Sequence, residues 1–375
     1  MARLGDIATY INGYAFKPTD WSNKGVPIIR IQDLTGNSYQ ANRYDGNYDM
    51  KYEVNSGDVL ISWSASLGVY IWTGEKAVLN QHIFKVQFDK AEVDKSFFVH
   101  QVECILNKAT GEAHGATMKH LTKPVFDALS FYLPKIEEQK QIANELNMVS
   151  DLISLRKQQL SKLDELVKSR FIELFGNILC DNNLPLVELK ELADIGSSKR
   201  IYANEYVESG VPFYRSKEIR ELGTGLKPSV ELFIKQERYE EIKAKYGVPK
   251  IGDILIAAIG ATIGYSWIVD TDKPFYYKDG NLIILSIKNN VNPIFLNHTI
   301  GILIEDFKSK GVAGSAQLAL TIEKLEKMMV INPRIDLQNQ FAAFVEQTDK
   351  SKFEIQKSLE KLETLKKALM QKYFG

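Results

Sequence analysis

The sequence predicts an α+β protein in which two mixed, mostly β domains are separated by two long helices. The clearest sign is an internal repeat, because residues 134–143 (PKIEEQKQIA) return 199 residues later as residues 333–342 (PRIDLQNQFA). A second sign is that residues 137–175 contain no proline or glycine and space their apolar residues by three and four. A duplicated unit that ends in a long helix predicts a pseudo-two-fold architecture within one chain.

Both predicted helices carry a heptad pattern, which is typical of a coiled-coil seam. Each helix is too polar to be buried in a globular core, so each needs a partner. Pairing with the other copy, antiparallel and within the chain, is the preferred interpretation, and pairing between chains is the alternative. The predicted seam residues are Leu146, Ile153, Leu160, Leu163 and Val167 in the first helix, and Val345, Ile355, Leu359, Leu362 and Leu369 in the second.

The two β domains share a frame of short motifs but differ in between. Gly25-Val26-Pro27 opens a predicted strand that ends at Arg30, and Gly210-Val211-Pro212 opens its counterpart, which ends at Arg215. Gly57-Asp58 and Gly252-Asp253 each precede a β-branched run, and we match the opening residues 4–7 with 192–195. The predicted boundaries are residues 1–134 and 181–333 for the domains, and 135–180 and 334–375 for the helices.

Composition limits the compartment and the possible partners. The chain has 47 basic and 47 acidic residues, so any nucleic-acid contact must use a local patch and not a global field. Two cysteines without metal-ligand spacing indicate a reducing, cytoplasmic setting, and the first residues do not resemble a signal peptide. The longest uncharged run, residues 254–269, is too short for a bilayer and predicts buried strands, so we expect no membrane partner.

The motifs of several enzyme classes are missing. The sequence contains no phosphate-binding G-x-x-x-x-G-K-[ST], no G-x-S-x-G and no H-E-x-x-H. The amino-methyltransferase motif Asn/Asp-Pro-Pro-Tyr/Phe and a glycine loop for S-adenosylmethionine are also missing. The five histidines do not pair at metal-ligand spacing. We therefore predict neither catalytic residues nor a metal site.

This ordered double set of motifs resembles the specificity subunit of a type I restriction-modification system. Leu133-Pro134-x-Ile136-x-x-Gln139, with its second copy, carries most of the resemblance, which covers essentially the whole chain. It implies two target recognition domains that each read half of a bipartite double-stranded DNA sequence, and a coiled coil that sets the spacer. It also implies two methyltransferase subunits that bring S-adenosylmethionine, and possibly restriction subunits that bring ATP and Mg²⁺, while this chain binds no cofactor itself.

The candidate DNA-binding residues lie in loops of the two domains. Arg30 and Arg215 can reach phosphates or guanine edges, and pairing with a nearby carboxylate is the equal alternative. Trp63 is interpreted as a core residue rather than a base-stacking one. The remaining candidates for phosphate or base contacts are Lys17, Thr117, Lys119, His120, Lys199, Arg200, Lys217, Ser315 and Gln317. For the lysines, His120 and Arg200, an ordinary solvated charge is the favoured alternative.

Two other classes of function compete with the DNA-binding scaffold. A structural coiled-coil adaptor that binds proteins and not DNA is favoured by the zero net charge. An enzyme with an unfamiliar site on the glycine-rich loops is the third possibility. Neighbouring genes for a methyltransferase and an ATP-dependent translocase would distinguish the scaffold from both.

Overall fold

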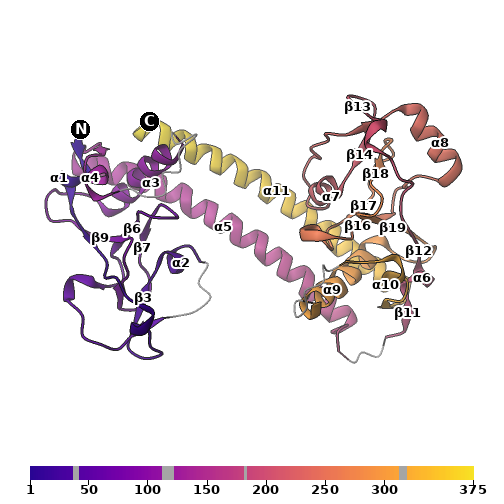
Figure 1. The fold of residues 1–375 in the computed structure, drawn as a ribbon, viewed down its shortest axis with the longest axis horizontal. Coiled ribbons are helices and arrows are strands. Elements are labelled where there is room, and N and C mark those ends of the chain that lie inside the picture. Colours follow the sequence, from indigo (N-terminus) through magenta and orange to yellow (C-terminus); the bar gives the residue numbers. More distant parts are fainter. Residues whose placement is uncertain (37–41, 112–121, 181–183, 312–318) are drawn as a thin grey trace. The chain divides into compact units, whose positions relative to one another are not determined.

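The computed structural model describes residues 1–36, 42–111, 122–180, 184–311 and 319–375. The chain forms two compact units (Figure 1). Unit 1 comprises Met1–Gln159 and Ile355–Gly375, and unit 2 comprises Leu160–Glu354. Each unit therefore contains one β-rich domain and one half of each long helix, so the compact units cut across the helical segments predicted from the sequence.

The two long helices are α5 (Ile136–Phe175) and α11 (Ile335–Phe374), of 40 residues each. In unit 1, Lys157 Nζ lies 3.3 Å from Glu363 and Tyr373 Oη donates to Glu145 at 2.6 Å. In unit 2, Lys352 Nζ lies 2.7 Å from Asp164, and the ring centroids of Phe171 and Phe341 are 5.3 Å apart. In each unit, numbers rise along α5 where they fall along α11, which confirms an antiparallel coiled coil within the chain. All ten predicted seam residues are buried or half-buried.

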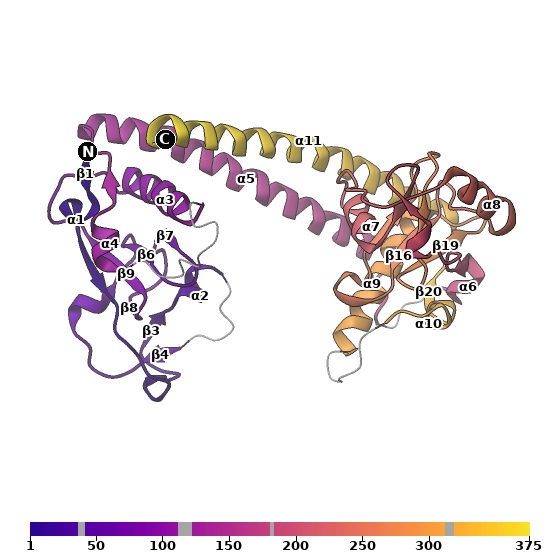
Figure 2. The same cartoon turned by 45° about the horizontal axis from the view of Figure 1, so that its top comes forward.

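Unit 1 contains two four-stranded sheets and one pair of strands (Figure 2). The first sheet is antiparallel throughout, in the order β2 (Thr9–Asn12), β9 (Ile83–Gln87), β6 (Val59–Ser62) and β7 (Gly68–Ile71). The second has the order β4 (Arg43–Tyr44), β3 (Val26–Ile29), β8 (Ala77–Leu79) and β5 (Glu53–Val54), with β3 parallel to β8. The pair is β1 (Ala2–Arg3) with β10 (Ser130–Phe131).

Unit 2 repeats this topology, so the predicted internal repeat is confirmed. Its antiparallel sheet has the order β12 (Ala193–Gly196), β19 (Leu282–Ile287), β16 (Ile254–Ala257) and β17 (Ser266–Ile268). The second sheet has the order β13 (Tyr206–Val207), β15 (Phe233–Ile234), β14 (Val211–Tyr214) and β18 (Tyr276–Tyr277), with β14 parallel to β18. The strand pair is β11 (Leu186–Glu188) with β20 (Met329–Ile331).

Shorter helices complete each unit. In unit 1 they are α1 (Leu4–Ile7), α2 (Ile31–Leu34), α3 (Lys95–Gly111), α4 (Lys123–Asp127) and the 3₁₀ turns η1 (Pro18–Asp20) and η2 (Met50–Tyr52). In unit 2 they are α6 (Leu189–Leu192), α7 (Ser216–Gly223), α8 (Gln236–Tyr246), α9 (Pro293–Gly311), α10 (Ile322–Glu326), η3 (Ala203–Glu205) and η4 (Gly260–Thr262). None of the described helices is both long and apolar enough to cross a membrane.

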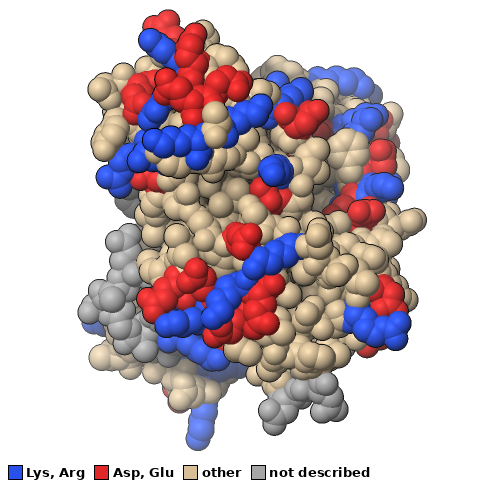
Figure 3. All heavy atoms as spheres, turned by 90° about the vertical axis from the view of Figure 1, so that its right-hand side faces the viewer, with Lys and Arg blue, Asp and Glu red and all other residues tan. Residues whose placement is uncertain are grey.

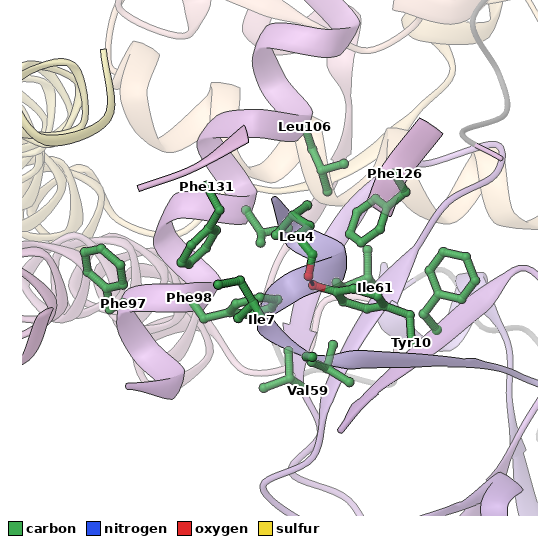
Figure 4. Close-up of a cluster of buried hydrophobic side chains, with 14 of the residues drawn as sticks. Leu4, Ile7, Tyr10, Val59, Ile61, Phe97, Phe98, Leu106, Phe126 and Phe131 are labelled. Carbon is green, nitrogen blue, oxygen red and sulfur yellow. Dashed lines mark hydrogen bonds between the residues drawn. The ribbon is translucent and has the colours of Figure 1, made fainter. Parts of the chain in front are cut away.

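The core of unit 1 lies where α1, α3 and α4 meet the antiparallel sheet. Figure 4 shows Phe98, Phe126 and Phe131 directed toward Leu4 and Ile7 from different elements. In unit 2 an aromatic cluster joins the helix pair to α9. There Phe171 and Phe175 of α5 contact Phe295 of α9 and Phe341 of α11, with ring centroids 4.9–6.2 Å apart. Burying several aromatic rings together fixes each domain to its own half of the helix pair.

One alignment made from the sequence is wrong. Residues 4–7 form helix α1, whose structural counterpart is α6 and not residues 192–195. The N–H of Leu4 donates to Leu129 O and that of Leu189 donates to Met328 O, both at 2.9 Å. The match was displaced by three residues because both segments place apolar residues three apart.

A buried glutamine explains the most specific motif of the repeat. Gln139 is 1% exposed, donates to Pro134 O at 2.8 Å and accepts the N–H of Asp94, which precedes α3, at 3.0 Å. Gln338 makes the same two bonds in unit 2, to Pro333 O at 2.8 Å and from the N–H of Asn292 at 2.9 Å. One side chain thus ties the start of the long helix to the start of the helix that packs on it.

Candidate nucleic-acid interface

In the first domain, four strands bring their loops to one edge of the sheets. Strands β2 and β6 end where β7 and β9 begin, and the turn from β8 to β9 joins this edge to the end of β3. The N–H of Gln81 donates to Tyr14 O at 2.8 Å, and that of Trp63 donates to His82 O at 3.1 Å. We call residues 12–14, 63–67 and 80–82, with Arg30, the loop edge of the first domain.

The backbone of this loop edge is tightly constrained. A Cβ atom on Gly13 would lie 2.0 Å from Asn80 O, so only glycine fits there. Ala65 (φ 59°) and His82 (φ 72°) occupy the left-handed region, where the second domain has Gly260 and Gly280 near the corresponding places. Such strain costs about 1–3 kcal/mol per residue and clusters at functional sites. The close contact at Gly13 and the two left-handed residues therefore fix the backbone conformation of this loop edge.

Uncharged polar and aromatic groups dominate the loop edge of the first domain. Trp63 is half-buried, stacks on Phe84 at 5.6 Å and donates its Nε1–H to Asn12 Oδ1 at 3.1 Å. Tyr14, which belongs to the same loop edge, is 46% exposed. Amides and aromatic rings are the groups that contact base edges and base faces. Trp63 was predicted to be a core residue. Its side chain is only half-buried, so the prediction is correct for the part that stacks on Phe84 and not for the rest.

Arg30 lies where β3 gives way to α2. Its guanidinium is 5.3 Å from the ring centroid of Trp21, and the backbone N–H of Arg30 donates to Asp33 Oδ2 at 2.8 Å. With the amide of Asn42 turned so that its oxygen faces the arginine, both terminal nitrogens donate to it at 2.8 and 2.9 Å. Arg30 is thus held at the loop edge by a ring and an amide.

Arg215 occupies the same position in the second domain with different partners. Its Nη2 lies 2.8 Å from Glu218, which is 0% exposed, and 2.9 Å from Glu231. The hydrogen bond to Glu218 raises the pKa of Arg215 above its ordinary value. Lys217 pairs with Glu231 at 2.7 Å, and Lys217 and Arg215 together lower the pKa of Glu231 to about 2. The sequence left two alternatives for Arg215, contact with DNA or pairing with a carboxylate, and the structure contains the pairing with carboxylates.

The other described candidates are Lys199 and Arg200 in the second domain and Lys17 in the first. Lys199 donates its backbone N–H to Tyr276 Oη at 2.6 Å, and Arg200 pairs with Asp279 at 2.7 Å, both just after β12. These residues form the loop edge of the second domain together with Arg215 and Lys217. Lys17 begins η1, and the hydrogen bonds that build the first loop edge do not include it. Five candidates lie outside the described residues: Thr117, Lys119, His120, Ser315 and Gln317.

Reasoning from the sequence missed the groups that surround the two arginines. Trp21 and Asn42 come from loops whose sequences do not match between the copies. Glu218 could have been found, because Arg-x-x-Asp at 30–33 and Arg-x-x-Glu at 215–218 place a helix-capping carboxylate three residues after each arginine.

Charges of the two signs are intermixed rather than segregated. Figure 3 shows basic side chains beside acidic ones across one face of the molecule. The two loop edges nevertheless differ, since the second contains Lys199, Arg200, Arg215 and Lys217. Among the described residues there is no cluster of three or more histidine, cysteine or acidic side chains suited to a metal ion.

Two equivalent domains, each built on the same frame and presenting a different loop edge, define a protein with two distinct binding modules. The chain matches the model of the type I restriction modification DNA specificity domain over residues 1–165 and 183–367, and it belongs to that family. Each match contains one loop edge.

Individual relatives agree with this assignment. The chain is 26% identical to the MjaVIII specificity subunit of Methanocaldococcus jannaschii over 400 residues, covering 99% of this chain and 90% of that subunit. It is 30% identical to the EcoBI specificity subunit of Escherichia coli over 168 residues, covering 44% of this chain and only 35% of that subunit. The S subunit of a type I restriction-modification system from M. genitalium has a similar fold, with TM-score 0.60, 16% identity, and coverage of 100% and 95%.

Proposed function

We propose that this chain is the non-catalytic specificity subunit of a type I restriction-modification complex, and that each domain reads one half of a bipartite DNA target. The proposal is supported mainly by one observation. The two domains have the same strand topology, but the residues at their loop edges differ. Arg30 and Arg215 follow equivalent parallel strands, yet one contacts an aromatic ring and the other two carboxylates. One frame with two surfaces is suited to reading two different half-sites.

The long helices are proposed to set the spacer and to dock methyltransferase subunits. A 40-residue helix is about 60 Å long at about 1.5 Å per residue. Base pairs stack at about 3.4 Å, so this length corresponds to roughly 17 base pairs. Several apolar side chains remain exposed on the helices, including Met148, Leu152 and Leu155, which supports a role in binding other subunits.

Catalysis is assigned to those partners. S-adenosylmethionine would be bound by the methyltransferase subunits, and ATP and Mg²⁺ by restriction subunits where the system has them. The chain itself is proposed to bring DNA and enzyme together, and purified alone it should neither methylate nor cleave DNA.

Mapping methylated adenines across a genome with and without this gene tests the function. We expect one bipartite motif to lose its methylation when the gene is deleted, and to regain it when the gene is restored. An unchanged methylation pattern would refute the assignment.

The spacer role is tested by lengthening both helices together. Four residues are inserted between Leu160 and Ser161 and four between Ser358 and Leu359, which keeps the register of each unit. The insertion adds about 6 Å and turns the helix face by about 40°. One added base pair turns DNA by about 35°, so we expect a spacer longer by one or two base pairs and unchanged half-sites. Insertion near Phe171 and Phe175 would instead disrupt the aromatic cluster. An unaltered spacer would rule out this role.

A further inference from the structure

A cleft of about 630 Å³ opens along β12, the edge strand of the antiparallel sheet in the second domain. Gly196 and Ile284 lie on neighbouring strands beneath it, and its other walls include Tyr246, Tyr276 and Asp253. Of the predicted DNA-binding residues, Lys199 lines this cleft, whereas Asp253 is not one of them.

Asp253 is a buried carboxylate in the lining of this cleft. It is 8% exposed, and its Oδ2 accepts the N–H of Lys250 at 2.9 Å. Burial raises the pKa of Asp253 above its ordinary value. Among the described residues, no lysine or arginine side chain forms an ion pair with it. Ser286 and the backbone of Ile287 also form hydrogen bonds with it, and the charge of Lys250 acts on it, so Asp253 is a hydrogen-bonded carboxylate that lacks a close cation. A close ammonium group would offset part of the cost of burying this charge.

The first domain shows what fills the same position there. Asp58 is the counterpart of Asp253, since each accepts the N–H three residues before it. Lys85 Nζ lies 3.0 Å from Asp58 and donates to Glu53 O at 2.6 Å. Ile284 occupies the position of Lys85 in the second domain. Lys85 of β9 is paired with Leu60 of β6, and Ile284 of β19 is paired with Leu255 of β16. The second domain thus replaces the lysine by isoleucine and leaves a cleft.

We propose that this cleft binds an alkylammonium group supplied from outside the chain, seated against Asp253 as the Lys85 ammonium is against Asp58. The alkyl part would lie over Ile284, and the exposed ring of Tyr246 (53%) would add a cation–π contact. Two lysines already lie near that ring, Lys199 with Nζ 5.5 Å and Lys245 with Nζ 5.4 Å from its centroid, so an incoming cation would compete with both. The ammonium can come from a free polyamine or from a lysine side chain of a partner subunit.

Calorimetric titration of the full chain tests the proposal with cadaverine, spermidine and Nα-acetyl-lysine methylamide as probes. We expect one saturable site for cadaverine. Spermidine binding at least tenfold tighter than the lysine amide would identify a polyamine site. Comparable binding of the two would identify a site for a lysine side chain. Failure of all three amines to bind at millimolar concentration would overturn the proposal, as would stronger binding of inorganic phosphate.

Two variants make the test specific to this cleft. Asp253→Asn removes the charge at nearly constant shape, and Ile284→Lys supplies an internal ammonium like that of Lys85. Each should weaken cadaverine binding at least tenfold, and Ile284→Lys should also raise the melting temperature. Lys85→Ile is the reciprocal variant and should create a second site beside Asp58. Unchanged binding in Ile284→Lys, with the variant folded, would show that amines bind elsewhere on the surface.

Discussion

Replacing Gln139 by alanine should weaken the joint between the first domain and its half of the helix pair. The substitution leaves two backbone groups without a partner, the N–H of Asp94 and the carbonyl of Pro134. A buried polar group that loses its partner costs about 1–3 kcal/mol. Two such groups, partly reached by water after the side chain is removed, give an expected destabilisation of about 2–4 kcal/mol.

Gln141 is the matched control for this change. It lies in the same helix two residues later and is exposed, so Gln141→Ala should alter the free energy of unfolding by no more than about 0.5 kcal/mol. Gln338→Ala should reproduce the effect of Gln139→Ala in unit 2, because the two hydrogen bonds are the same. Gln340→Ala, also exposed, is the control there.

The assay combines urea unfolding with hydrogen exchange, because two compact units need not unfold in one step. Gln139→Ala should speed amide exchange at the start of α3 and leave the start of α9 unchanged, and Gln338→Ala should do the reverse. If Gln139→Ala lowers stability no more than Gln141→Ala, the buried glutamine is not what joins helix to domain.

Three further predictions concern packing, charge and pH. Phe341→Ala should destabilise unit 2 by about 3–5 kcal/mol because it empties the aromatic cluster, whereas Phe353→Ala, at a 65% exposed position, should have little effect in thermal unfolding. Arg215→Ala should cost unit 2 about 3 kcal/mol in urea unfolding by leaving a buried carboxylate unpaired; an unaffected midpoint would contradict this. Burial lowers the pKa of His100 and His298 below the ordinary value of 6.5, so each binds a proton less readily in the fold than in the unfolded chain. The fold should therefore lose stability as pH falls below 6.5, and the double variant to glutamine should lose less between pH 7.5 and 5.5.

The regular elements follow closely from local sequence. The predicted helix at 137–175 differs by one residue from α5, because a long heptad pattern without proline or glycine permits little else. Strands β6 and β16 follow Gly57-Asp58 and Gly252-Asp253 as expected, since a turn before a β-branched run is a strong local signal.

The loop edges could not be predicted in the same way. That β3 and β8 run parallel, which brings Arg30 to the turn before β9, depends on pairing residues about 50 positions apart. The left-handed conformations of Ala65 and His82 contradict their own preferences and are imposed by the surrounding strands. Local sequence patterns predict the helices and strands. The loop edges cannot be predicted from them, because contacts between segments distant in the sequence form these surfaces.

The cationic candidates of the second domain can be ordered by what a DNA contact would cost each of them. Arg215 would have to leave a fully buried Glu218, at about 3 kcal/mol. A single phosphate contact does not compensate for that, since hydrogen bonds to charged groups contribute about 1.5–3 kcal/mol. Lys217 forms an exposed ion pair with Glu231, which water and salt already screen, so it exchanges a carboxylate for a phosphate at little cost. Arg200 is exposed, but its partner Asp279 is only 16% exposed, so the cost for Arg200 lies between those for Lys217 and Arg215. Of these three residues a phosphate contact would cost Arg215 the most, so we predict phosphate contacts at Lys217 and Arg200 rather than at Arg215.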